Sequence, residues 1–153
     1  MHGVEGLGSC RNPRVRDMTG LFNLIARILL AAMFLASSRA ALSDIAGAAQ
    51  YFAGLGLSPG MLFAWGVGLF ELVSGVLLVI GYQIRIVSIV LVLFTLAASY
   101  LGHYGQGGDD AFATFMHSQL LLKDIAVAGG LMLLGLYGAG RLSVDGWRGG
   151  PQG

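Results

Sequence analysis

The apolar stretch 61–81 constrains this chain most, because Glu71 and Ser74 are its only strongly polar side chains. A helical run of about 20 residues, rising 1.5 Å per residue, matches a bilayer core of about 30 Å. Glu71 stands ten residues from either end of the stretch, which puts its carboxyl near the bilayer midplane. An acidic group there costs roughly 2.5–3.5 kcal/mol on insertion scales. We therefore expect Glu71 to face other helices, either as a structural carboxyl that keeps them in register or as a functional one.

Composition supports the same class. The chain has 153 residues, of which 56% are hydrophobic and 11% charged, whereas typical soluble domains are about 25% charged. This predicts a single-domain integral membrane protein surrounded by lipid. A net charge of +1 argues against nucleic acid as a partner. The single cysteine, Cys10, excludes an internal disulfide.

Three more apolar runs are long enough to span a membrane, at residues 21–38, 84–101 and 118–137. The segment 42–53, between the first two spans, is shorter and more polar, and is typical of an amphipathic helix at the membrane surface. After it, Ser58 is the expected cap of the second span, with Pro59 at the first helical position. The predicted fold class is all-α: an integral membrane four-helix bundle with a short amphipathic helix between spans one and two.

Basic residues predict the orientation. Residues 1–19 are expected to form a cytoplasmic tail without folded structure, 20–146 the membrane domain, and 147–153 a C-terminal tail. The positive-inside rule places the side richer in Lys and Arg in the cytoplasm. Six arginines lie on one side, against Arg39 alone on the other, and a start at Met18 would leave three against one. We expect an inner-membrane protein with both termini cytoplasmic. The six arginines are Arg11, Arg14, Arg16, Arg85, Arg141 and Arg148.

Several ionisable residues fall at the opposite, outer ends of the spans, notably Arg39, His103, Lys123 and Asp124. Helical neighbours point about 100° apart, so Lys123 and Asp124 are not expected to face one partner together. Two interpretations stand: snorkelling near a helix end, or a polar pocket closed by Arg39, Lys123 and a histidine. Because Arg and Lys only donate hydrogen bonds, such a pocket would suit an anion or a quinone carbonyl.

Two other features each leave a choice. Arg27, inside the first span, either snorkels to the near interface or reaches toward Glu71 as its charge partner. His103 and His117 could hold a haem or metal between helices, but no third ligand has suitable spacing. We therefore predict hydrogen bonding for both histidines and no metal site.

Read in order, these landmarks resemble the DoxX family of small four-helix membrane proteins. The matching features cover residues 20–146. In the first half they are R-I-L-L-A-A-M-F-L-A-S-S-R in span one, then Asp44, Y-F-A-G-L-G-L, and E-L-V-S-G-V-L-L-V-I-G around Glu71. In the second half they are Arg85, the histidine at the end of span three, L-L-K-D-I-A-V-A-G-G-L around Lys123, and G-x-G-R-L-S-V-D. Arg39 stands where the family usually has Lys, and Asp124 where it usually has Asn.

The resemblance implies a role in thiol and sulfur redox balance, with quinone-linked thiosulfate oxidation in some relatives and detoxification complexes in others. We expect a redox-associated membrane subunit, part of a quinone-linked oxidoreductase, with quinone as candidate cofactor and redox proteins or a second copy as partners. Alternatives are a non-enzymatic assembly subunit and a small-solute carrier, the latter disfavoured because inverted repeats are lacking. The candidate ligand residues are Arg39, Glu71, His103, Lys123 and Asp124.

Overall fold

The computed structural model describes residues 13–149, with side chains from Met18 onward. Its elements are α1 (Pro13–Ser43), α2 (Ile45–Gly54), α3 (Gly60–Ile80), α4 (Ile84–His103), α5 (Ala111–Tyr137) and α6 (Val144–Trp147). Four of these helices, α1, α3, α4 and α5, are long and apolar enough to cross a membrane. The all-α class, the four spans and the short helix α2 between the first two are therefore confirmed.

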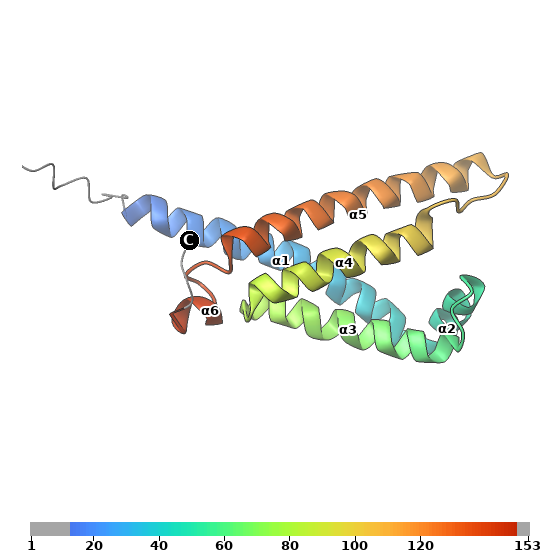
Figure 1. Cartoon of the computed structure of the whole chain (residues 1–153), viewed down its shortest axis with the longest axis horizontal. Helices are drawn as coiled ribbons and strands as arrows, with labels where there is room; N and C mark the ends of the chain where they lie inside the picture. The colour runs from blue at the N-terminus through green and yellow to red at the C-terminus, as the bar shows by residue number, and fades with distance from the viewer. Residues whose placement is uncertain (1–12, 150–153) are drawn as a thin grey trace, which may run out of the picture.

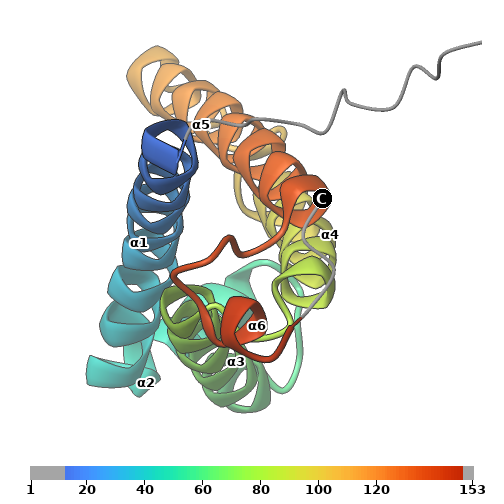
Figure 2. The same ribbon diagram turned by 90° about the vertical axis from the view of Figure 1, so that its left-hand side faces the viewer.

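The four long helices form two antiparallel pairs. Helix α1 packs mainly on α3, and α4 on α5, with few contacts between the pairs. Figures 1 and 2 show the pairs diverging from the end that carries α6, which we call the latch end. The opposite end carries α2 and the α4–α5 loop, and we call it the α2 end. The short α3–α4 turn would favour close antiparallel neighbours, yet these two helices separate after it.

Small residues bring α1 and α3 together. A Cβ added to Gly68 would lie 2.8 Å from the Leu42 side chain, and one added to Gly75 would lie 2.8 Å from Leu35. Between these contacts, Ser38 Oγ donates to the Gly68 carbonyl at 2.8 Å. Close approach through glycine and interhelical hydrogen bonds are the usual means of packing helices in lipid.

A set of side chains, Asn23, Arg27 and Asp145, joins the segments at the latch end, and we call it the latch. Arg27 is 1% exposed; it donates to the carbonyls of Ala139 at 2.7 Å and Val79 at 2.8 Å. Asn23 donates to the Gly138 carbonyl at 2.9 Å. Asp145 accepts from the amides of Gln83 and Ile84 at 2.8 and 2.9 Å, which occupies free N–H groups at the start of α4.

Arg27 thus settles one of the two choices left by the sequence. Its guanidinium is directed to the near end of the bundle, as snorkelling requires, but is buried against carbonyls rather than placed in headgroups. Among the described residues, no ion pair joins it to Glu71. Of the two alternatives, the charge pair between Arg27 and Glu71 was wrong, because backbone carbonyls of α3 and the α5–α6 segment are nearer acceptors.

Helix boundaries differ from the sequence expectations in three places. Helix α1 begins at Pro13, inside the tail expected to be unfolded, and proline suits a first helical position. Helix α5 begins at Ala111 rather than 118, because the Asp110 carboxylate accepts from the amides of Phe112 and Ala113. Ser58 is not the cap of α3: Pro59 occupies that position, without a side-chain hydrogen bond.

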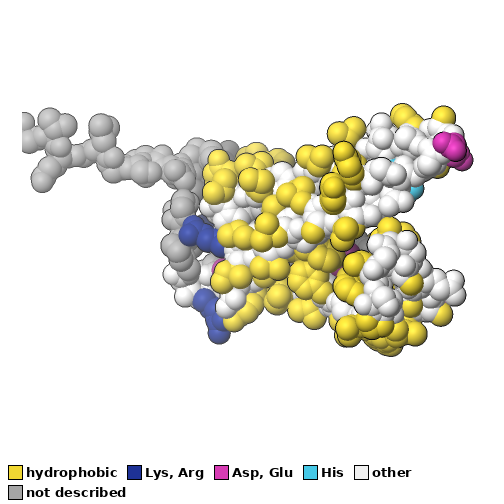
Figure 3. Space-filling model, turned by 45° about the vertical axis from the view of Figure 1, so that its right-hand side comes forward, with side chains coloured by type: hydrophobic (Ala, Val, Ile, Leu, Met, Phe, Trp, Pro, Cys, Tyr) yellow, Lys and Arg dark blue, Asp and Glu magenta, His cyan; other side chains and the backbone are white. Residues whose placement is uncertain are grey.

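The surface between the two ends is apolar. Large exposed hydrophobic side chains occur on all four long helices, including Phe22, Leu69, Leu93 and Leu136. Figure 3 shows hydrophobic side chains over the length of the helices, with basic groups at the latch end and acidic groups at the tip of the α4–α5 hairpin. Such a surface matches a lipid environment.

Candidate functional site

The divergence of the two helix pairs leaves a cavity of about 440 Å³ toward the α2 end. This volume lies within the range of small-molecule sites, roughly 300–1,000 Å³. The wall is largely apolar and includes Met33, Phe34, Phe52, Phe63 and Phe94. The polar side chains that line it are Ser37, Tyr51, Glu71, Thr95, Ser99, His103, Lys123 and Asp124. Figure 3 shows the surface hollowed between α2 and the α4–α5 tip.

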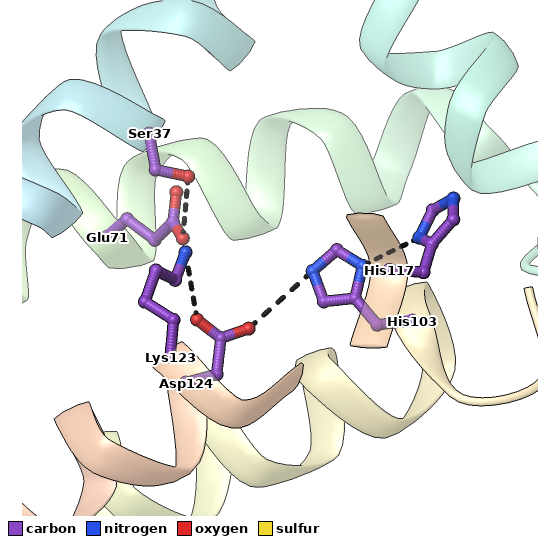
Figure 4. Close-up of polar contacts among 6 residues, drawn as sticks. All are labelled: Ser37, Glu71, His103, His117, Lys123 and Asp124. Atoms are coloured by element: carbon purple, nitrogen blue, oxygen red, sulfur yellow. Dashed lines mark hydrogen bonds and ion pairs between the residues drawn. The ribbon is translucent and has the colours of Figure 1, made fainter. Parts of the chain in front are cut away.

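Glu71 contributes a buried carboxyl from the middle of α3. It is 7% exposed, and its Oε1 accepts from Ser37 Oγ of α1 at 3.1 Å (Figure 4). Its Oε2 is buried and has no hydrogen-bond partner among residues 18–149. The hydroxyls of Thr95 and Ser99 on α4 are also buried and have no hydrogen-bond partner among these residues. A buried polar group without a partner costs about 1–3 kcal/mol, and all three groups belong to residues that line the cavity.

A second polar group crosses from α5 to the end of α4 (Figure 4). Lys123 Nζ lies 3.1 Å from Asp124 Oδ1, and Asp124 Oδ2 lies 3.6 Å from His103 Nε2. The other nitrogen of that ring, Nδ1, is 3.1 Å from His117 Nδ1. Lys123 is half exposed, whereas the Asp124 side chain is largely buried. Four ionisable side chains therefore form a continuous series that ends beside the cavity.

The sequence did not predict that Lys123 and Asp124 would face one partner together, and of the two Asp124 is buried whereas Lys123 is half exposed. Both line the cavity, because the four-carbon stem of Lys123 bends round the helix until its ammonium meets the neighbouring carboxylate. Helical angle limits where the Cβ atoms point, but not where a long flexible side chain ends.

Of the five candidate ligand residues, the structure gathers Glu71, His103, Lys123 and Asp124 in one lining. Arg39 is not among the residues that line the cavity, and it is exposed. The preceding residue, Ser38, is the one that faces α3, and a step of about 100° along α1 turns Arg39 outward.

Sequence reasoning missed the hydroxyl groups of the cavity and the tyrosine of α2. A signal was present in α4, since Thr95, Ser99 and His103 recur every four residues and so share one helix face. Tyr51 lies outside the spans, and its hydroxyl lies close to Gly102 of α4, where an added Cβ would be 2.8 Å from it. Burial raises the pKa of the Tyr51 hydroxyl. Within the described chain, no group of three or more His, Cys, Asp or Glu side chains is arranged to hold a metal ion.

Known proteins resemble this chain along most of its length. The DoxX family model matches residues 22–104. The inner membrane protein YqjF of Escherichia coli K12 is 30% identical over 122 residues, which are 80% of this chain and 88% of YqjF. The inner membrane protein YphA of the same organism is 30% identical over 123 residues, 80% of this chain and 86% of YphA. No solved structure gives a significant match. The chain therefore belongs to the DoxX family and is an integral, multi-pass inner-membrane protein.

Proposed function

We propose that this protein is a redox-associated membrane subunit that binds a quinone head group in the cavity between its two helix pairs. The observation that supports this most is the combination of apolar walls with the unpartnered buried oxygens of Glu71, Thr95 and Ser99. A quinone is a flat apolar ring with two carbonyl acceptors. The aromatic wall suits the ring, and the hydroxyls of Thr95 and Ser99 and the ammonium of Lys123 are donors for the carbonyls.

The charge of the lining favours a neutral ligand over an oxyanion. With Arg39 outside the cavity, Lys123 is the only Lys or Arg among the described residues that line it, and Lys123 is already paired with Asp124. Glu71 adds a second carboxyl to the same lining. A thiosulfate-like anion would meet two acids and one neutralised cation, whereas a quinone carbonyl needs only donors. We therefore place the sulfur chemistry suggested by the family resemblance on a partner protein, with quinone as the ligand of this chain.

The orientation of the molecule is part of the proposal. The arginine excess at the latch end favours that end in the cytoplasm, which puts the α2 end and the cavity mouth on the outer side. Reporter fusions test this orientation. A reporter that works only in the cytoplasm should be active when fused after Gly153, and a reporter that works only outside the cytoplasm should be active in the loop near Asp109. A C-terminus found outside would reject the orientation and leave the cavity unchanged.

Quinone binding is tested with the full chain in lipid nanodiscs. Ubiquinone-1 and menadione should raise the melting temperature, and thiosulfate should not. Lys123→Met should weaken quinone binding about tenfold, the effect of losing one charge-assisted hydrogen bond. Lys123→Arg should restore it in part, because the guanidinium fork differs in shape from an ammonium.

Arg39→Met is the matched control, since it removes a cation near the same end that does not line the cavity. This variant should leave the quinone-induced rise in melting temperature unchanged. Equal shifts for the wild type and Lys123→Met, or a larger shift with thiosulfate than with quinone, would reject the proposal.

A further inference from the structure

The two histidines have a geometry that simple packing does not explain. Their rings lie 5.4 Å apart between centroids and are tilted by 45°, and each directs its Nδ1 at the other across 3.1 Å. Only one proton fits between these two nitrogens, so one ring must donate and the other accept. The hydrogen bond between the two rings therefore has a direction, from the donor ring to the acceptor ring.

Asp124 determines that direction. A carboxylate beside His103 Nε2 favours a proton on Nε2, as carboxylates commonly fix the tautomer of a neighbouring imidazole. A neutral His103 then has a free lone pair on Nδ1 and must accept from His117 Nδ1–H. The N–H donors of the two rings then point the same way, from His117 to His103 to Asp124. His117 lies outside the cavity lining, whereas His103 and Asp124 are part of it.

We propose that His117, His103 and Asp124 form a proton path that connects the α2 end to the cavity. A proton binds His117 at Nε2, and the proton on Nδ1 of that ring passes to His103 Nδ1. His103 releases its Nε2 proton to Asp124 Oδ2, beside the cavity. Each ring gains one proton and gives up one, so no oxidant or reductant is needed. The 3.6 Å contact between His103 and Asp124 is too long for a hydrogen bond and must close to about 3 Å for this step.

Other groups around the pair are placed to support this role. The charged groups that act on His103 are Asp124, His117 and Lys123, all from α5. Lys123 pairs with the other carboxylate oxygen, Oδ1, and leaves Oδ2 for the histidine. Helix α2 adds the Tyr51 hydroxyl beside Gly102, and α3 adds Glu71 in the same cavity lining. The use of the path by a ligand rests on the proposed function, because reduction of a quinone consumes protons and oxidation of a quinol releases them.

The path can be tested without any ligand. The chain has three histidines, so ¹⁵N-histidine labelling of the full protein in nanodiscs gives few signals to assign. In the unmodified protein, we expect a ¹⁵N–¹⁵N coupling across the Nδ1–Nδ1 contact and the Nε2–H tautomer of His103. A His103 with its proton on Nδ1, or no coupling between the rings, would overturn the proposal even if every variant failed to fold.

Exchange with water separates a path from a structural contact. His117→Gln keeps an N–H donor toward His103 but cannot pass a proton from one ring nitrogen to another. It should retain the His103 tautomer and slow the exchange of the His103 Nε2 proton with water by roughly 100-fold, the low end of what a positioned acid–base group contributes.

Tyr104→Phe is the control, since it changes an exposed polar side chain beside His103 and should leave the exchange rate unchanged. Unchanged exchange in His117→Gln would show that water reaches His103 directly and would overturn the path. Quinone binding takes no part in this measurement, so the failure of either proposal can be recognised without the other.

Discussion

The two ends of the molecule use buried polar groups differently. At the latch end, Arg27 and Asn23 bond backbone carbonyls of other segments, and Asp145 bonds the first amides of α4. At the α2 end, the buried polar side chains that line the cavity are instead paired with other side chains or have no partner among the described residues. Buried atoms without a partner occur at both ends, Arg27 Nε and Asn23 Oδ1 among them, but Glu71, Thr95 and Ser99 are the ones that line the cavity.

The apolar core also differs between the two ends. Its cluster includes Ala31, Leu78, Ile84 and Leu131, which join both helix pairs, and extends to Ala139 beside the latch. Toward the α2 end the pairs separate, and the cavity takes the place of that packing. Packing and hydrogen bonds thus join the helix pairs at the latch end, whereas a cavity separates them at the α2 end.

Arg27→Met should have the largest effect. It removes both guanidinium hydrogen bonds and leaves the carbonyls of Val79 and Ala139 without their donor. A buried carbonyl that loses a charged partner costs about 1–3 kcal/mol, so we expect a loss of roughly 3 kcal/mol in the free energy of unfolding. Unfolding by denaturant in mixed micelles measures this free energy. Arg39→Met is the control, and equal stability of the two variants would mean that the latch contributes nothing.

Asp145→Ala should have a smaller effect. The carboxylate accepts from the Gln83 and Ile84 amides in the manner of a helix cap, and loss of a cap costs about 1 kcal/mol. Asp145→Asn keeps one acceptor oxygen and should fall between the wild type and alanine. Asp109→Ala, in the loop at the other end, serves as the matched control. If Asp109→Ala proved as costly as Asp145→Ala, the contrast between the ends would fail.

Glu71→Leu should have the smallest effect on stability and a large one on binding. It removes a carboxyl whose Oε2 has no partner in the described part of the chain, so the free energy of unfolding should stay within about 1 kcal/mol of the wild type or rise. The rise in melting temperature with quinone should be lost, because we propose that the Glu71 carboxyl is protonated and donates a hydrogen bond to one quinone carbonyl. Glu71→Gln keeps the shape and a hydrogen-bonding amide, and so separates the need for a polar group from the need for a charge. Normal quinone binding by Glu71→Leu would leave this carboxyl without a role in the site.

The sequence was sufficient for the spans because length and hydrophobicity decide whether a helix can cross a bilayer. It also indicated Glu71 and Lys123, since charged groups inside apolar runs need a reason to be there. The partners of Arg27 could not be found in this way, because they are backbone carbonyls and carry no signal in the sequence. The short helix α6, capped by the Ser143 hydroxyl, and the cap formed by Asp145 depend on tertiary contact in the same way.

The composition of the cavity was the least predictable feature. Glu71 and Lys123 were expected as ligand residues from their depth, but the pairing of α1 with α3 and α4 with α5 decides which helix faces meet. That pairing turns Arg39 outward and brings in Ser37, Tyr51 and Ser99. A polar stripe on α4 could have indicated part of this lining, whereas the contribution of Tyr51 requires the position of α2.

The central claim, that a quinone binds between the helix pairs at the α2 end, is tested most directly by photolabelling. An azidoquinone is activated on the full chain in nanodiscs, and the modified peptides are located by mass spectrometry, with decylubiquinone as competitor. We predict competitor-sensitive adducts in the α1, α2 and α4 segments that line the cavity, around residues 33–37, 51–57 and 94–103. Adducts confined to residues 79–85 and 138–148 at the latch end, or spread over the apolar surface and insensitive to competitor, would contradict the account.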